Sequence, residues 1–204
     1  MDPNKFGFIP NSYTTLALMS MMHHWLEATD GNGAYVRAAL LDCKKAIYLE
    51  DHDLLIANLS SLGVKSTVVN WIIAFLRGSS QRVKLSSDCV SDFTPVPAGI
   101  PQGTCIGPWL FFVMVNDLPT SSDPLSGIWK FADDTTVSEI VPKSGATEIQ
   151  DTVDHVLQWS NDNKFKLNLL KCKEFRIDFR RKPNEVTEIE AYGNLSKPLN
   201  QQKY

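Results

Sequence analysis

The chain has 204 residues, of which 43% are hydrophobic and 21% are charged, so it is long enough to bury a sizeable core in one or two domains. Its formal net charge of −3 counts against a free-standing nucleic-acid binder, because that class usually carries a basic surplus. The four cysteines form no C-x-x-C pair, which argues against a zinc site or a disulfide scaffold and favours a reducing compartment.

The ends and apolar runs of the sequence indicate where the protein works. Met1 is followed by the polar residues Asp-Pro-Asn-Lys, which do not resemble a secretory signal. The longest apolar run, around residues 106–115, is too short to span a bilayer. We therefore expect a soluble intracellular protein of the cytoplasm or nucleus with no membrane partner. The sequence does not indicate an oligomeric state.

The first predicted elements are a helix and a buried strand. Ser12 can cap a helix that runs to about Ala28, and we expect its apolar residues near one face, namely Leu16, Met19, Met22 or His23, and Leu26. Small and β-branched apolar residues then form the run AYVRAALLD, which predicts a buried strand ending at Asp42. Arg37 lies inside this strand and is a candidate to pair with an acid.

The middle of the chain predicts two helices, a strand and an irregular loop. The first helix is capped near Asp51 or Asp53, and the second opens at Ser66. Residues 81–85 alternate polar and apolar, as a half-buried strand does. Two prolines and three glycines in AGIPQGTCIGP then fix an irregular backbone that can approach a ligand closely. A short apolar helix follows this loop.

The stretch IWKFADDTTVSEI, residues 128–140, predicts a hairpin with two carboxylates at its tip. Both flanks are rich in aromatic and β-branched residues, and Asp133 and Asp134 lie in the turn between them. Taken alone, such a pair is most often a solvated turn. Adjacent carboxylates repel each other, and a bound cation is the most direct way to neutralise them.

The full order of elements predicts an α+β protein with helices on one face of an antiparallel sheet. A helix from Gly145 to about Asn161 and a further strand complete this order. If the strand ending at Asp42 lies beside the hairpin, three carboxylates converge, and they suit hard divalent cations such as Mg²⁺. Two such ions about 3.5–4 Å apart would stabilise the attacking and leaving oxygens of a phosphoryl displacement.

Five sequence blocks together carry a family resemblance. They are LLDCKKA, AGIPQGT-x-x-GP-x-LF, NDLP, FADDTT and W-S-x-x-N-x-x-x-LN-x-x-KC, in this order. This series closely resembles the reverse transcriptase, an RNA-directed DNA polymerase, of non-LTR (LINE-type, jockey-like) retrotransposons. The resemblance runs from about Asp2 to Phe179. It implies a polymerase palm with a ferredoxin-like sheet and partial fingers over residues 1–180, and a tail or the start of a missing thumb over residues 181–204.

The resemblance also implies a reaction and its partners. The reaction is the addition of dNTPs to a primer 3′ end along an RNA template, with two Mg²⁺ ions as cofactors. Asp42, Asp133 and Asp134 match the metal ligands, although Asp42 alone could also be a helix cap or an ion-pair partner. The Cys43 carbonyl is implied to face a metal. Lys171 matches the region that offers a proton to pyrophosphate, where Lys173 could compete.

Further positions match the family's substrate contacts. The incoming nucleotide and the template base are implied to rest against a loop formed by Gly99, Pro101, Gln102 and Gly103. Phe131 and Ala132 match the positions that contact the primer end. Ile47 matches the residue that blocks the ribose 2′-hydroxyl. The family usually has an aromatic residue there and an aspartate at the position of Tyr48, so we expect weaker rejection of ribonucleotides.

The extent of the resemblance leaves other functions open. It begins at the block Lys5-Phe6-Gly7-Phe8, without the fingers segment that precedes it in the family, and few residues follow Phe179. We expect a truncated or decayed copy, or a partial gene model. A catalytically inactive remnant that binds nucleic acid or protein is therefore the alternative to an active enzyme. An RNA-templated RNA polymerase shares the three-carboxylate palm, but the PQG loop and the KC block disfavour it.

Overall fold

The structure of the protein is a computed structural model that describes residues 4–7, 9–31, 33–43, 51–96, 98–101, 103–121, 123–180, 187–191, 197–198 and 200–203. Three residues singled out by the sequence, Ile47, Tyr48 and Gln102, lie outside the described residues, and so does Phe8. The chain forms two compact units, residues 1–44 with 117–204 and residues 45–116, and each is described by itself.

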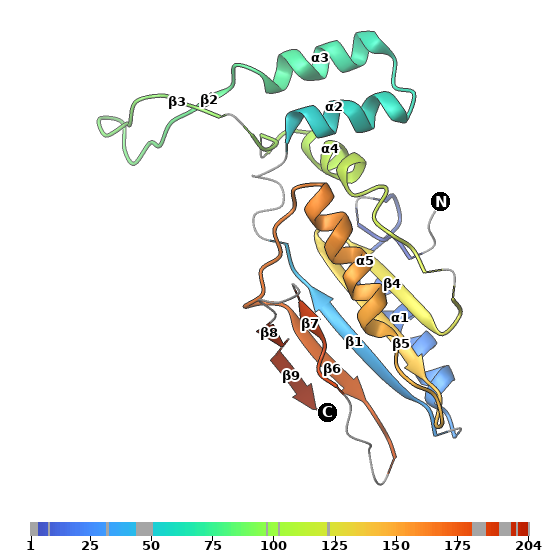
Figure 1. The fold of residues 1–204 in the computed structure, drawn as a ribbon. Helices are drawn as coiled ribbons and strands as arrows, with labels where there is room; N and C mark the ends of the chain where they lie inside the picture. Colours follow the sequence, from blue (N-terminus) through green and yellow to red (C-terminus); the bar gives the residue numbers. More distant parts are fainter. Residues whose placement is uncertain are drawn as a thin grey trace. The chain divides into compact units, whose positions relative to one another are not determined.

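The first unit is built on a sheet of five strands in the order β4-β5-β1-β6-β9 (Figure 1). All neighbours pair antiparallel except β6 and β9, which pair parallel. The first four strands in this order have the arrangement of a ferredoxin-like βαββαβ fold. The α+β class predicted from the order of elements is confirmed. The strands are β1 (Tyr35–Leu41), β4 (Ser126–Phe131), β5 (Asp134–Val141), β6 (Lys173–Ile177) and β9 (Asn200–Lys203).

Helices cover both faces of this sheet, which corrects the prediction of helices on one face. Figure 1 shows α5 (Ile149–Asp162) across one face and α1 (Thr14–Thr29) on the other. Side chains along β1 point alternately to the two faces of the sheet. Ala39 and Leu41 belong to the core cluster under α5. Val36 and Ala38 belong to the cluster around Trp25 of α1. A strand apolar on both faces, as β1 is, requires both covers.

The face that α1 turns to the sheet differs from the predicted one. Leu16, Met19 and Leu26 are 46%, 63% and 50% exposed, whereas Ala17 and Trp25 are buried. Trp25 Nε1 donates a hydrogen bond to Ser138 Oγ at 2.9 Å, which fixes the inner face. Because α1 is apolar around much of its circumference, the spacing of its apolar residues did not select this face.

A buried polar network joins three strands under α5. Arg37 is 2% exposed, and its Nε and Nη2 donate to Glu174 Oε1 at 3.0 and 2.6 Å. The same guanidinium donates to Thr147 Oγ1 at 3.3 Å and to Thr187 O at 2.6 Å. Thr147 Oγ1 in turn donates to Glu139 Oε2 at 2.6 Å. The prediction that Arg37 pairs with an acid is confirmed, and the pair is Arg37 with Glu174.

Residues beyond 186 also contact the sheet. Ile189 is 1% exposed in the core cluster under α5, and its N–H donates to Glu174 Oε2 at 3.0 Å. Two further short strands, β7 (Glu190–Ala191) and β8 (Lys197–Pro198), pair with each other. The boundary between the palm and a tail or thumb at residue 180 stays a prediction.

The described residues of the second unit form three helices and a two-stranded ribbon. The predicted cap of the first helix is Asp51, whose side chain accepts hydrogen bonds from Asp53 N and Leu54 N at 2.9 and 3.1 Å. The helix that it caps packs against the other two. No helix in the described part of the chain is long and apolar enough to cross a membrane. The elements are α2 (His52–Ser61), α3 (Ser66–Leu76), β2 (Ser80–Gln81), β3 (Thr94–Pro95) and α4 (Gly107–Met114).

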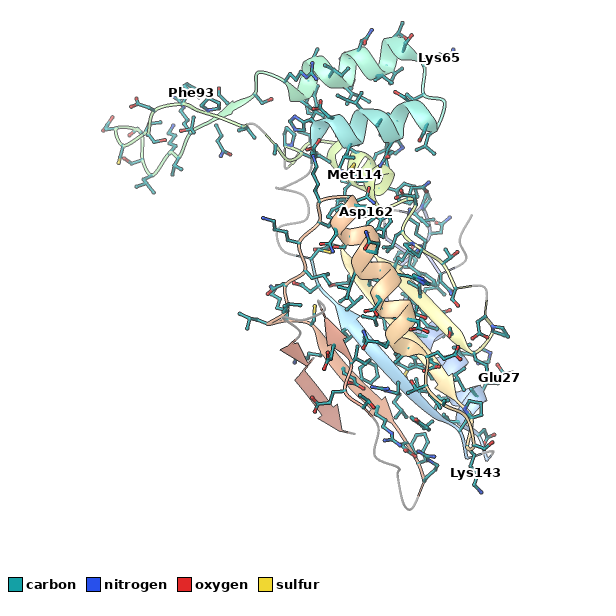
Figure 2. The ribbon with its side chains drawn as sticks, in the orientation of Figure 1. Glu27, Lys65, Phe93, Met114, Lys143 and Asp162 are labelled. Atoms are coloured by element: carbon teal, nitrogen blue, oxygen red, sulfur yellow. The ribbon has the colours of Figure 1, made fainter. Side chains whose placement is uncertain are left out.

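We call the ribbon of residues 79–96, with β2 and β3 at its base, the arm. The half-buried strand predicted for residues 81–85 is wrong, because β2 ends at Gln81 and Val83 and Leu85 are 63% and 81% exposed. Phe93, labelled in Figure 2, is 62% exposed, and the Arg82 guanidinium lies 4.7 Å from its ring centroid. Alternation of polar and apolar residues needs a covering element before it produces a half-buried strand.

Candidate active site

The β4–β5 hairpin turns at the predicted aspartates. Phe131 pairs with Asp134 across the hairpin, so Ala132 and Asp133 form a two-residue turn. Ala132 has φ +54°, in the left-handed region that a residue with a Cβ rarely adopts. Strain of this kind persists only where the surroundings hold it, and such positions concentrate at functional sites. The conformation of this turn is therefore held in place by the residues around it.

The register between β1 and β5 places the third carboxylate at the same end of the sheet. Leu41, the last residue of β1, lies opposite Thr135, so Asp42 follows directly after the strand at the level of Asp134. Asp42, Asp133 and Asp134 thus come from neighbouring strand ends. The structure places these three predicted residues at the same end of the sheet.

The backbone of Asp42 is held by the segment before β6. The Asp42 carbonyl oxygen accepts a hydrogen bond from Asn168 N at 2.7 Å, and the Asp42 N–H contacts Cys172 Sγ at 3.4 Å. Cys43, the next residue, forms a β-bridge with Leu167. We did not single out Asn168 or Cys172 from the sequence as positioning residues. The signal for them was present, because both belong to the LN-x-x-KC block.

The side chain of Asp42 has one satisfied oxygen and one that is not. Lys171 Nζ lies 3.6 Å from Asp42 Oδ1, with the lysine side chain 68% exposed and the aspartate side chain 22% exposed. Asp42 Oδ2 is buried and has no hydrogen-bond partner in the part of the chain that the structure describes. A buried carboxylate oxygen without a partner is unfavourable unless a cation neutralises it. The predicted role of Lys171, to offer a proton to pyrophosphate, stays a prediction.

Burial and the neighbouring negative charges both raise pKa values at this site. Desolvation, then Asp133 and Asp42, raise the pKa of Asp134, whereas Lys171 lowers it. Burial, followed by the charge of Asp133, raises the pKa of the Cys43 thiol to about 12. Cys43 is therefore a neutral thiol near pH 7 and a poor metal ligand through sulfur. Its predicted metal contact through the backbone carbonyl stays a prediction.

The residue types at this end of the sheet are suitable ligands for a divalent cation. Oxygen ligands and several negative charges are what Mg²⁺ requires, and the buried Oδ2 of Asp42 has no hydrogen-bond partner among the described residues. As the side chains lie, no three His, Cys, Asp or Glu groups among the described residues are arranged to hold one metal ion. Movement of the three carboxylates toward one point would be needed to complete a metal site.

The other predicted contacts lie in two places. Phe131 is half-buried and packs beside Phe6, Ala17 and Trp129, and Ala132 follows it in the turn. Their predicted contact with a primer end stays a prediction.

The predicted nucleotide loop belongs to the second unit. Gly99 and Gly103 have φ +87° and +77°, which a glycine adopts without strain. His52 Nε2–H donates to Gly99 O at 2.8 Å, and Thr104 Oγ1 donates to Pro101 O at 2.9 Å. These bonds give the loop a defined shape within its own unit.

Comparisons with known proteins agree with this architecture. The sequence profile of the family described as reverse transcriptase (RNA-dependent DNA polymerase) matches residues 1–194. The RNA-directed DNA polymerase from mobile element jockey of Drosophila melanogaster is 26% identical over 212 residues, covering 98% of this chain and 22% of that protein. This chain therefore spans about a fifth of that relative's length.

Two solved telomerase structures from Candida tropicalis share the fold. One is apo telomerase truncated from the C-terminal domain, with a TM-score of 0.64 at 10% identity over 90% of this chain and 38% of that chain. The other is telomerase in complex with a fragment of telomeric RNA, with a TM-score of 0.65 at 9% identity over 90% of this chain and 32% of that chain. The profile covers nearly the whole sequence and the motifs predicted a reverse transcriptase, so the chain belongs to the reverse transcriptase (RNA-dependent DNA polymerase) family.

Proposed function

We propose that this chain is the polymerase domain of a mobile element and adds dNTPs to the 3′ end of a DNA primer along an RNA template. One observation carries the proposal. Three carboxylates, Asp42, Asp133 and Asp134, come from adjoining strand ends, and the buried Oδ2 of Asp42 accepts no hydrogen bond from any described residue. Membership of the reverse transcriptase family supports the choice of reaction.

The three carboxylates are proposed to hold Mg²⁺ through their oxygens. Two bound Mg²⁺ ions would supply charge stabilisation for the attacking and leaving oxygens of an in-line phosphoryl displacement. Asn168 and Cys172 contact the Asp42 backbone, and these contacts fix the position of the backbone from which the Asp42 side chain extends. The chain itself thus contributes mainly position and charge.

We propose that Lys171 has one role before a metal ion binds and another during the reaction. Its Nζ, 3.6 Å from Asp42 Oδ1, neutralises that carboxylate when no other cation is present. Because its side chain is mostly exposed, it can turn toward substrate phosphates and give a proton to the departing pyrophosphate. We assign this role to Lys171 rather than Lys173 because of this contact.

The remaining roles concern nucleotide and primer. We propose that Gly99, Pro101, Gln102 and Gly103 support the incoming nucleotide and template base, and that Phe131 and Ala132 contact the primer end. Ile47 is proposed as the gate at the ribose 2′-hydroxyl. A branched aliphatic side chain fills less of that space than an aromatic ring, so Ile47→Phe should raise the preference for dNTPs over rNTPs. A strong preference that Ile47→Phe leaves unchanged would exclude Ile47 as the gate. The expected location in the cytoplasm or nucleus also remains a prediction.

The decisive experiment is Mg²⁺-dependent extension of a DNA primer annealed to an RNA template. We expect the wild-type chain to extend the primer and Asp133→Asn to reduce the rate on the order of 10³-fold. Glu27→Gln removes the same charge from a side chain that is 75% exposed at the end of α1 (Figure 2), and it should extend normally.

Two outcomes of this assay would contradict the proposal. A folded wild-type chain that extends no primer would support the inactive remnant instead. Equal activity of wild type and Asp133→Asn would show that the carboxylates are not the active site.

A further inference from the structure

The first described residues of the chain extend the sheet beyond β4. Lys5 forms a parallel β-bridge with Lys130, and Phe6 N donates a hydrogen bond to Lys130 O at 2.8 Å. Lys130 N donates to Asn4 O at 2.9 Å. We call residues 4–7 the N-terminal brace. The brace occupies the outer edge of β4, which has no other strand beside it among the described residues.

The brace ends in direct contact with the turn that carries the aspartates. A Cβ added to Gly7 would lie 2.1 Å from Ala132 N, 2.9 Å from Ala132 Cα and 3.1 Å from the Phe131 carbonyl carbon. These are backbone atoms, which cannot rotate away as a flexible side chain can. Gly7 does not have a positive φ, so its backbone conformation is open to other residues. Lack of space at the turn is therefore what requires glycine here.

Two features make this contact suited to holding the turn in place. The brace is anchored by Phe6, which is 7% exposed in a cluster with Ala17 and Trp129. The turn that it touches is strained at Ala132, with φ +54°, and a strained residue keeps its conformation only under constraint from its neighbours. Gly7 supplies such a constraint at the strained residue itself.

We propose that Gly7 is a positioning residue, through which the N-terminal brace fixes the Ala132–Asp133 turn and thereby the carboxylates of Asp133 and Asp134 relative to Asp42. This proposal rests on the proposed metal-dependent function of the three carboxylates. It assigns the block around Lys5-Phe6-Gly7 to the metal centre, although none of its side chains is a ligand.

The test compares Gly7→Ala with a matched variant, using Mn²⁺ as the probe and electron paramagnetic resonance of free Mn²⁺ as the readout. Gly7→Ala should weaken Mn²⁺ binding about 10-fold or more, in the range measured for groups that support metal ligands. Gly145→Ala is the control, because its added Cβ would meet only Pro142 side-chain atoms at 3.0 Å and beyond. The control should bind Mn²⁺ as wild type does. Folded Gly7→Ala with wild-type Mn²⁺ affinity would overturn the proposal.

Hydrogen exchange of the wild-type chain tests the brace even if Gly7→Ala fails to fold. The amides of Phe6 and Lys130 should be protected, because both donate across the brace. Exchange of both at unprotected rates would overturn the proposal without reference to metal. Mn²⁺ binding by Asp133→Asn distinguishes failure of the positioning role of Gly7 from failure of the proposed metal site. If wild type binds Mn²⁺ no better than Asp133→Asn, the proposed metal site fails and the positioning role falls with it.

Discussion

The β4–β5 hairpin and the arm are antiparallel ribbons that both contain apolar residues but have different surroundings. The β4–β5 hairpin is rich in β-branched and aromatic residues, is covered on both faces by helices and is flanked on both edges. The arm also carries apolar residues, yet Val83, Leu85 and Phe93 are more than half exposed. Isolated two-stranded ribbons are marginally stable in water. Residue type therefore favours an extended backbone in both ribbons, whereas the neighbouring elements decide whether the ribbon is buried and rigid.

The largest expected effect comes from truncating one aromatic residue in each ribbon. Trp129 of β4 is 4% exposed and Phe93 of the arm is 62% exposed. Trp129→Ala should lower the free energy of unfolding by about 3–5 kcal/mol, because it leaves a cavity in the core. Phe93→Ala should change it by less than about 0.5 kcal/mol. Urea denaturation followed by far-UV circular dichroism measures both, and equal losses would erase the contrast.

Replacing an arginine should likewise cost more stability in the sheet than in the arm. Arg37→Met leaves the buried Glu174 carboxylate without its partner and should destabilise the fold by about 3–5 kcal/mol. Addition of Glu174→Met should recover much of this loss, since the unpaired charge is then absent. Arg82→Met removes an exposed cation–π contact with Phe93 and should lower stability by at most about 1 kcal/mol. Thermal unfolding of the three variants gives the comparison, and an Arg37→Met protein as stable as Arg82→Met would contradict it.

The sheet also has guanidinium groups over an aromatic ring, but here an acid completes the cluster. Arg176 and Arg180 lie 4.2 and 4.3 Å from the Tyr35 ring centroid, and both pair with Asp178. The hydrogen bond from Arg180, followed by further bonds and the charge of Arg176, lowers the pKa of Asp178 to about 2.

The pH dependence follows from the sign of this shift. The folded state favours the ionised carboxylate, so its stabilisation is present above about pH 4 and is lost as pH falls toward 2. Asp178→Asn should lose about 2 kcal/mol at pH 7 and no longer show this loss between pH 4 and 2. Urea unfolding at a series of pH values measures it. Parallel pH profiles of wild type and variant would exclude Asp178 as the source.

The smallest expected effect concerns the strained turn. Ala132→Gly removes the steric penalty at φ +54° and should raise stability by about 1 kcal/mol. Ala74→Gly is the control, because it places glycine in helix α3 and should lower stability by about 1 kcal/mol. Differential scanning calorimetry distinguishes the opposite signs. A loss of stability in Ala132→Gly would show that the turn is not strained.

The parts of the site that could be predicted are those with a local cause. A buried strand followed directly by Asp42 and a turn containing Asp133 and Asp134 are both visible in a short window of sequence. Their proximity required only that two apolar strands lie side by side, and the register of β1 with β5 provides it.

The parts that could not be predicted depend on contacts between distant segments. Gly7 reads as an ordinary loop glycine until Ala132 is placed against it. The inner face of α1 was predicted wrongly because Leu16 and Trp25 are equally apolar, and the hydrogen bond of Trp25 to Ser138 decides between them. The half-buried strand predicted for residues 81–85 was wrong because the exposure of a strand depends on what surrounds it. Each error concerns which neighbour is present, which a short window does not contain.

The position of β1 in the chain has a consequence for biosynthesis. Its two partners, β5 and β6, are both translated after it, with residues 45–116 in between. At about 5–20 residues per second, an apolar strand with two bare edges waits for several seconds on the ribosome. Such edges are templates for intermolecular pairing. Slower translation of residues 45–116 should therefore increase aggregation of the nascent chain, and chaperones that shield β1 during this interval should increase the yield of folded protein.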